Sequence, residues 1–205
     1  FLDLLKSPRA GCLYHVADRN GVAVTAVPTT SLTEEELIKL LRYRLAQYVA
    51  IGFIDPKTVY EAGVTHEPLS YVTPSDVHFI AARASNGEIL CYACMRALEN
   101  PPPGATLKTV ERPLFPVETS FGWGVFNRLQ MLPDIPIWKI RELKRLVKNQ
   151  QVPKLDELAT RAPVEISLAV VRTLTGRLRM EVDAFIGDLE EMVAKRHLEY
   201  FHMPS

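Results

Sequence analysis

Glu142 and Arg145 stand three residues apart in the segment WKIRELKRLV, and both carry side chains that could do chemistry. Side chains alternate between the two faces of an extended strand, so a regular strand would point these two apart. The apolar pattern, however, changes phase between Ile140 and Leu143, which is typical of one extra residue inserted as a β-bulge. A bulge would bring Glu142 and Arg145 to the same side and leave a backbone N–H unpaired.

These groups together suit an acyl transfer. The Glu142 carboxylate could hold or deprotonate an amine. The unpaired N–H could polarise a thioester carbonyl while negative charge develops on its oxygen. The pattern alone also fits an exposed edge strand, whose charged side chains protect it from pairing with another chain. Both interpretations require a strand over residues 137–147.

Local signals indicate the elements that hold this strand in place. Asn20-Gly21 joins two β-type runs and predicts a hairpin. Thr33 and Glu36 form one of two overlapping capping-box pairs ahead of a leucine stripe at helical spacing. Pro163 suits the first turn of a later helix. The predicted elements are strands near 12–17 and 22–27, a helix to about 50, strands at 76–84, 89–98 and 137–147, a helix at 163–175, a strand near 180–185 and a helix at 189–203.

This order of elements predicts the fold class. Strands outnumber helical crossovers, so the sheet must be mixed, with antiparallel hairpins early and a parallel strand–helix–strand unit late. We expect an α/β fold in which helices flank a mixed central sheet. The length of 205 residues fits one domain spanning 1–205.

Composition narrows the classes of function. The chain carries 24 basic and 24 acidic residues, so its formal net charge of zero would not draw it to nucleic acid or to an anionic membrane. No apolar run reaches the length of a membrane-spanning helix. Three cysteines are too few for a disulfide framework and fit a reducing compartment. We expect a cytoplasmic protein with no membrane span and no nucleic-acid partner.

The stretch Arg141–Val147 resembles the Glu-x-x-Arg strand motif of acyl-homoserine lactone synthases, which have the GNAT acyltransferase fold. The resemblance implies a GNAT-like sheet and an acyl group delivered by an acyl carrier protein. It also implies an amine substrate, which is S-adenosylmethionine in that family. In the family, a set of arginines and glutamates shapes the pocket for the amine.

Two other segments match the same family in the same order. Arg44 with Tyr48, followed by Gly52-Phe53, resembles the early Arg-x-x-x-Phe and Gly-Trp elements. Arg96, in the stretch CMRAL, resembles the Arg-Leu-Leu strand end. The likeness covers about 40–150, with Tyr48 in place of the family's phenylalanine and Phe53 in place of its tryptophan.

Other features depart from the family. It has an acidic pair in the loop before the next strand, whereas Asp76 is the only aspartate between Asp55 and that strand here. A related branch, the long-chain N-acyl amino acid synthases, fits about equally well. Typical GNAT enzymes hold the coenzyme A pyrophosphate with a glycine-containing loop, but 148–162 has no glycine. A carrier-protein donor is therefore favoured over free acyl-CoA.

These considerations define the expected site. Glu142, Arg145 and Tyr200 are the catalytic candidates, with Glu142 binding or deprotonating the amine and Tyr200 protonating the leaving thiolate. The candidate substrate-binding residues are Arg44, Tyr48, Phe53, Arg96, Trp123 and Phe126. The basic residues expected to dock an acidic carrier protein are Lys144, Lys148, Lys154 and Arg172, together with Arg161, Arg177 and Arg179.

Several alternatives are open at this point. Trp123 and Phe126 could line a tunnel for an acyl chain or simply pack in a core, Tyr200 could be an ordinary packed aromatic, and the basic residues could be dispersed. The expected co-substrate is an acyl thioester on phosphopantetheine or coenzyme A, with no permanently bound cofactor and no metal. A non-catalytic ligand sensor on the same fold and a conventional acyl-CoA acetyltransferase are the alternatives to an autoinducer-synthase-like N-acyltransferase.

Overall fold

The computed structural model describes residues 2–128 and 134–187. Tyr200 and the helix predicted for 189–203 therefore lie outside the described residues. No helix in the described part of the chain is both long and apolar enough to cross a membrane.

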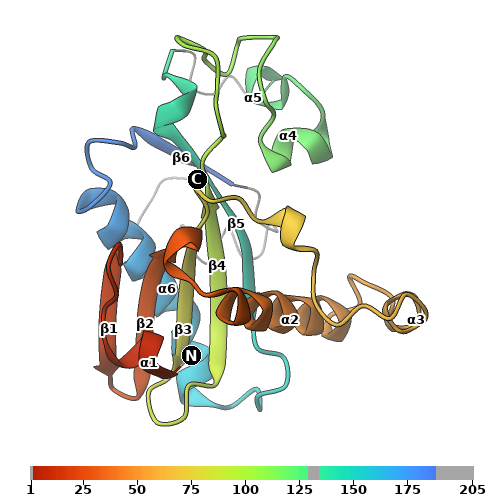
Figure 1. Cartoon of the computed structure of the whole chain (residues 1–205), viewed down its shortest axis with the longest axis vertical. Coiled ribbons are helices and arrows are strands. Elements are labelled where there is room, and N and C mark those ends of the chain that lie inside the picture. The colour runs from red at the N-terminus through yellow and green to blue at the C-terminus, as the bar shows by residue number, and fades with distance from the viewer. Residues whose placement is uncertain (1, 129–133, 188–205) are drawn as a thin grey trace.

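A mixed sheet forms the centre of the described chain (Figure 1). Its six strands lie side by side in chain order. Neighbouring strands are antiparallel except β5 and β6, which are parallel. This confirms the predicted α/β class, with hairpins early and a parallel pair late. The strands are β1 (Tyr14–Arg19), β2 (Val22–Pro28), β3 (Val77–Arg83), β4 (Ile89–Arg96), β5 (Ile140–Lys148) and β6 (Ala184–Ile186).

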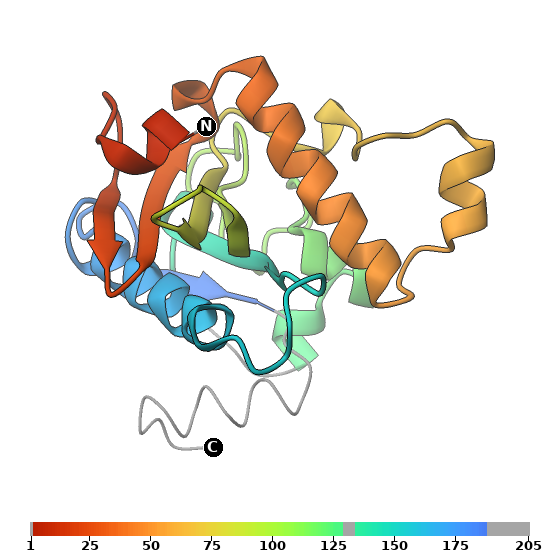
Figure 2. The ribbon, with the colours of Figure 1, turned by 90° about the horizontal axis from the view of Figure 1, so that it is seen from below.

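Helices cover both faces of the sheet, as Figure 2 shows from below. One face is covered by α1 (Leu2–Lys6) and α2 (Glu34–Ala50), and the other by α6 (Glu157–Thr175), which connects β5 to β6. The short helix α3 (Pro56–Glu61) stands away from the sheet. The short helices α4 (Pro116–Phe121) and α5 (Val125–Arg128) lie in the segment between β4 and β5.

Each face of the sheet has its own core. Phe79 and Cys91 belong to the core beneath α6, and Ile80 and Cys94 belong to the core beneath α2. The two cysteines are thus buried on opposite faces, because residues three apart on a strand point to opposite sides.

The first hairpin and α2 begin where their local signals predict. Asn20 and Gly21 both adopt positive φ angles, of 51° and 87°, as the tightest hairpin turns require. Thr33 caps α2 through a complete capping box, in which its side chain accepts from the Glu36 N–H and Glu36 accepts from the Thr33 N–H.

Helix α6 begins earlier than predicted. Asp156 caps it and accepts a 2.9 Å hydrogen bond from the Ala159 N–H, so the helix starts at Glu157 and Pro163 lies inside it. The side-chain cap at Asp156 supplies the start signal that Pro163 was expected to supply. The prediction that Pro163 lies in the first turn of this helix is therefore wrong.

Strand β6 is shorter than predicted and starts later. The chain leaves α6 through consecutive turns, in which the Leu178 N–H bonds to the Thr173 carbonyl and the Val182 N–H bonds to the Leu178 carbonyl. Extended pairing with β5 starts only at Ala184, instead of near residue 180. The strand therefore pairs with Ile140–Glu142, at the start of β5.

Candidate functional site

Strand β5 contains the predicted bulge. Tyr92 of β4 lies opposite Val147 and Cys94 lies opposite Lys144, so two steps along β4 match three along β5. Arg145, in the additional step, has a φ of 61°, in the left-handed region that non-glycine residues rarely adopt. The phase shift seen in the sequence thus corresponds to a real bulge.

The bulge brings Arg145 to the face beneath α2, where Glu142 and Lys144 already lie. Glu142 lies opposite Arg96, two positions along β4 from Cys94 of the α2 core. Arg145 reaches the carboxylate that Arg44 of α2 also binds. Glu142 and Arg145 are therefore on the same side of the sheet, as predicted.

Glu67 joins two of the predicted arginines. Its Oε2 lies 2.5 Å from Arg44 Nε, and its Oε1 accepts a 2.6 Å hydrogen bond from Arg145 Nη1. Arg44 is only 1% exposed, so the pair with Glu67 lies in the protein interior. Burial raises the pKa of Glu67, although the charge of Arg44 opposes the shift.

Asp76 binds the third arginine. Arg96 donates from Nε and Nη2 to both oxygens of Asp76, at 2.8 and 2.7 Å, and the Thr73 hydroxyl donates at 3.1 Å. Burial alone would raise the pKa of Asp76, but the hydrogen bonds from Arg96 and the charge of Lys144 lower it below its ordinary value. The carboxylate is thus held ionised between β4 and β5.

The loop before β3 therefore supplies two acids, Glu67 and Asp76, where sequence reasoning found only one. Glu67 was missed because it follows no periodic pattern and is a glutamate rather than an aspartate. The signal that could have found it is the excess of arginines, since Arg44, Arg96 and Arg145 each need a carboxylate partner once buried.

A groove of about 500 Å³ opens beside these ion pairs. Arg96 and Arg145 line one side of it and the start of α4 lines the other. Glu142 lies behind this α4 wall, 1% exposed, where its Oε1 accepts a 3.2 Å hydrogen bond from the Val117 N–H. We call this cavity the arginine groove, and its lining includes Tyr71, Arg96, Arg145, Leu114, Pro116 and Ser120.

The two aromatic residues of the α2 end lie beside the ion pairs. Tyr48 is partly buried next to Arg44, and burial raises its pKa to about 12. Phe53 contacts the Tyr48 ring, with the ring centroids 5.6 Å apart, yet 77% of Phe53 is exposed. Tyr48 thus lies beside Arg44, whereas Phe53 is exposed against the Tyr48 ring, and neither residue lines the groove described above.

Trp123 and Phe126 do not line a tunnel in the described structure, and neither do the neighbouring aromatics Phe115 and Phe121. Phe115 and Phe126 are buried in a third core cluster with Ile137. Trp123 and Phe121 are largely exposed, and none of the four lines either pocket described here. Core packing explains the buried pair, since together they fill the space between the 105–126 segment and the start of β5.

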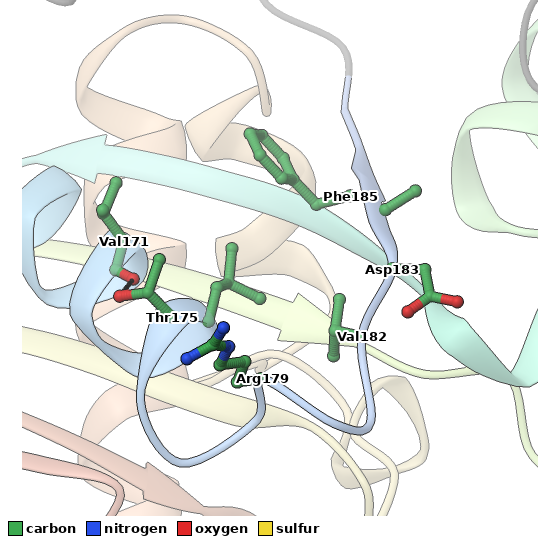
Figure 3. Close-up of a pocket in the computed structure, with 8 residues that line it drawn as sticks. Val171, Thr175, Arg179, Val182, Asp183 and Phe185 are labelled. Atoms are coloured by element: carbon green, nitrogen blue, oxygen red, sulfur yellow. Dashed lines mark hydrogen bonds between the residues drawn. The ribbon is translucent and has the colours of Figure 1, made fainter.

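A second cavity, of about 530 Å³, lies between α6 and β6 (Figure 3). Val171 projects from the last turns of α6, and Phe185 projects from β6 on the other side. Leu174, Val182 and Ala184 make the lining mostly apolar, with Arg179 at its edge. We call this cavity the α6–β6 pocket.

The predicted carrier-docking patch does not form as one surface. Lys144 is buried beside Asp76, because regular alternation places it on the same face as Glu142, opposite Cys94 of the α2 core. Lys154 and Arg172 lie at opposite ends of α6, whose 19 residues span about 28 Å. Arg161 donates to the carbonyls of the first hairpin. Lys148 is half-buried at the far end of β5.

Three of the basic residues still gather beside one cavity. Arg172, Arg177 and Arg179 are exposed and follow one another at the C-terminal end of α6. Arg179 itself lines the α6–β6 pocket. Basic residues are favourable at a helix C-terminus for any fold; here one of them, Arg179, also adds a positive charge to the lining of an apolar pocket.

His78 lies beneath the ion pairs and should make stability depend on pH. Its Nδ1 and the Tyr92 hydroxyl share a 2.8 Å hydrogen bond, and burial lowers the pKa of His78 from 6.5 to about 4. The folded protein therefore favours neutral His78, so its contribution is complete above about pH 7 and is lost as pH falls from 6.5 to 4. We expect a loss of about 3 kcal/mol in the free energy of unfolding across this window.

Urea unfolding at a series of pH values measures this loss. The His78→Gln variant, which cannot titrate, should show a flatter profile between pH 6.5 and 4.5, even if it is less stable at pH 7. Asp76 would add a further loss, but only below its unfolded pKa near 3.8. Parallel profiles for the two proteins would contradict a buried neutral His78.

Comparison with known proteins names no activity for this chain, so its chemistry is argued from the residues described above. No family model matches the chain, and no curated protein matches it. An integron cassette protein from the mobile metagenome of V. cholerae is 8% identical, with 91% of this chain and 86% of that chain covered and a TM-score of 0.47. A mutant protein from Bacillus halodurans, solved by a structural genomics consortium, is 14% identical, with coverages of 89% and 92% and a TM-score of 0.39.

Proposed function

We propose that this chain is a GNAT-type N-acyltransferase that moves an acyl group from a thioester to the amine of a small molecule. One observation carries the proposal: the bulge in β5 places Glu142 and Arg145 on the same face as Arg44 and Arg96. The resemblance to acyl-homoserine lactone synthases rests on the same four positions. It adds the expectation of a fatty acyl group.

In this proposal Glu142 removes a proton from the acceptor amine, directly or through a water molecule. The amine nitrogen then attacks the thioester carbonyl, the carbon–sulfur bond breaks, and the thiolate leaves and takes up a proton. A backbone N–H at the bulge stabilises the oxyanion that forms in between. Arg44, Arg96 and Arg145, held by Glu67 and Asp76, keep the acceptor pocket in shape.

The α6–β6 pocket is our proposed site for the acyl chain. Its lining is apolar, as an aliphatic chain requires. Phe185 of this lining pairs with Arg141 of β5, and the next residue, Ile186, pairs with Glu142. The pocket wall is thus on the strand next to that of the proposed base, on the α6 face of the sheet, opposite the face that carries Glu142. The thioester arm would be phosphopantetheine on an acyl carrier protein or coenzyme A.

One observation favours a second candidate function, a non-catalytic ligand sensor. Glu142 is almost fully buried and already accepts a hydrogen bond from the Val117 N–H. A carboxylate with that bond could serve to hold α4 in place rather than to move protons. A sensor would bind an amine in the arginine groove without forming a product.

The distinguishing experiment is mass spectrometry of lipids extracted from cells that express the chain. It is followed by assays of the purified protein with acyl-carrier-protein and acyl-CoA donors. An acyltransferase yields a new N-acylated amine or lactone, whose mass identifies both substrates. Saturable binding of a small amine with no acylated product from either donor would instead support the sensor.

The three arginines beside the α6–β6 pocket give a prediction about the donor. Reversing Arg172 and Arg177 together to glutamate should raise the KM for an acyl-carrier-protein donor about tenfold, because like charges then face the acidic helix of the carrier. The KM for an acyl-pantetheine without the carrier should change little. Steady-state kinetics at low and high salt measures the effect, which should shrink at high salt.

A matched control for this prediction is the double reversal of Lys6 and Lys57. Both are exposed and lie in α1 and α3, away from α6. This control should leave both KM values within about twofold, since distant surface charges are screened at moderate salt. Equal increases in KM for the two double variants would show that carrier docking does not use the α6 end.

A further inference from the structure

Two arginines from neighbouring strands line the arginine groove, Arg96 at the end of β4 and Arg145 at the bulge of β5. One residue of the loop before β3 contacts both of them. Arg96 Nη2 donates a 2.6 Å hydrogen bond to the Tyr71 carbonyl oxygen, and the Arg145 guanidinium lies 5.9 Å from the centroid of the Tyr71 ring. The two guanidinium groups therefore converge on the same part of the groove.

Each guanidinium keeps N–H groups that make no hydrogen bond within the described residues. Arg96 binds Asp76 through Nε and Nη2, which leaves its Nη1 without a partner there. Arg145 binds Glu67 through Nη1, which leaves its Nε and Nη2 without one. None of these three nitrogens is buried, and the two side chains are 16% and 24% exposed in the groove. Three nitrogens thus remain available to a ligand.

Positive charge is in excess on this face within the described residues. Two carboxylates, Glu67 and Asp76, are each shared by two cations. The cations are Arg44 and Arg145 for Glu67, and Arg96 and Lys144 for Asp76. Glu142 adds a third carboxylate, but it lies behind α4, and Glu99 of the groove lining is exposed, where salt screens its charge. The groove therefore favours an anion.

The number and placement of the free nitrogens fit a phosphate better than a carboxylate. The Nε–Nη2 edge of Arg96, which could grip a carboxylate in a bidentate pair, is already occupied by Asp76. What remains is three nitrogens on two side chains. A phosphate monoester presents three terminal oxygens as strong acceptors, one for each nitrogen, whereas a carboxylate presents two.

We propose that the arginine groove binds the phosphate group of a small phosphomonoester through Arg96 and Arg145. This inference rests on the proposed function in one respect: if the groove holds the acceptor, the acceptor is an amine that carries a phosphate. The left-handed backbone of Arg145, with its φ of 61°, is then the strained conformation that turns this guanidinium into the binding site.

Isothermal titration without an acyl donor measures this site directly. The probes are inorganic phosphate and the amines O-phosphoethanolamine, β-alanine and ethanolamine, which share a short chain and differ in their phosphate, carboxylate or hydroxyl group. The wild type should bind phosphoethanolamine at least about tenfold more tightly than the other two amines, as hydrogen bonds to a charged group allow. Inorganic phosphate should compete with it. No saturable binding of either phosphate up to about 10 mM would overturn the inference.

Arginine variants locate the site. Arg145→Gln should weaken the binding of phosphoethanolamine at least about tenfold, since it removes the charge and most of the donors. Arg42→Gln is a matched control, because Arg42 is exposed on α2 and does not line the groove, and it should bind like the wild type. Arg179→Gln tests the α6–β6 pocket. A loss in Arg179→Gln as large as that in Arg145→Gln would overturn the inference.

Substitutions on the opposite wall keep the test decisive even if Arg145→Gln fails to fold. Leu114 is exposed and lines the groove on the α4 side. Leu114→Glu should weaken the binding of phosphoethanolamine and Leu114→Lys should strengthen it, each about three- to fivefold at low salt and less at high salt. Equal affinities for these two variants at low salt would contradict a phosphate in the groove.

Turnover assays separate the failure of this inference from the failure of the proposed function. The assays offer the same amines with acyl-carrier-protein and acyl-CoA donors. Acylation of the amines that lack a phosphate, but not of phosphoethanolamine, would overturn the inference and leave the acyltransferase proposal intact. The expected binding of phosphoethanolamine without acylation of any amine would leave the phosphate site standing and overturn the acyltransferase proposal.

Discussion

Replacing Glu142 with glutamine is expected to lower the rate of amide formation about 10²- to 10⁴-fold, the usual contribution of a general base. Glutamine has nearly the same shape as glutamate, and its carbonyl oxygen can still accept the Val117 N–H that Glu142 accepts at 3.2 Å. The fold around α4 is thereby preserved, and only the ability to take a proton is lost. Product formation by mass spectrometry and donor binding by titration are the two measurements.

Donor affinity should be unchanged in this variant, because the proposed acyl site lies on α6 and β6. Glu88→Gln is a matched control, since Glu88 is exposed in the second hairpin and its carboxylate pairs with Arg83. It should turn over like the wild type. A Glu142→Gln enzyme that keeps more than about a third of its activity would exclude general base catalysis by Glu142.

Replacing Glu118 with alanine should reduce the free energy of unfolding by about 3–5 kcal/mol, the range for a broken buried ion pair. Glu118 accepts hydrogen bonds from both terminal nitrogens of Arg112, at 2.7 and 2.5 Å, and both side chains are at most 1% exposed. It also accepts the Phe115 N–H at the start of α4. The variant leaves the Arg112 guanidinium buried beside no carboxylate and removes a cap.

Two further variants separate the charge effect from the effect of truncation. Glu111→Ala removes an exposed glutamate one residue before Arg112 and should stay within about 0.5 kcal/mol of the wild type. The double variant Arg112→Met with Glu118→Leu removes both charges and should recover most of the loss, since neither charge is then buried alone. Urea unfolding measures all three. A loss below about 1 kcal/mol for Glu118→Ala would show that Arg112 finds another partner.

The bulge in β5 can be predicted from the sequence because it changes the order of apolar and polar residues within the strand itself. Apolar side chains mark the buried face of a strand, so inserting one residue shifts the apolar phase between Ile140 and Leu143. The same reasoning places the hairpin at Asn20-Gly21 and the capping box at Thr33. These features depend on neighbours in the chain, which the sequence displays directly.

Features that depend on distant partners were harder to foresee. Lys144 was expected in an exposed basic patch, yet it lies on the buried face with Glu142, where it meets Asp76 from a distant loop. Glu67 lies 78 residues before Arg145, and nothing local in its loop indicates that the two meet. Trp123 and Phe126 are close in the chain, yet one is exposed and the other is in a core.

The left-handed backbone at Arg145 limits the residue types that a redesigned protein could carry at this position. Only glycine, asparagine and aspartate adopt that conformation readily, and β-branched residues pay about 1–2 kcal/mol for it. A diversification library at this position would consequently be depleted of β-branched residues and enriched in glycine, asparagine and aspartate. Leu114 and Ser120, on the opposite wall, are exposed and have ordinary backbones. Laboratory evolution of acceptor preference should therefore begin with that wall.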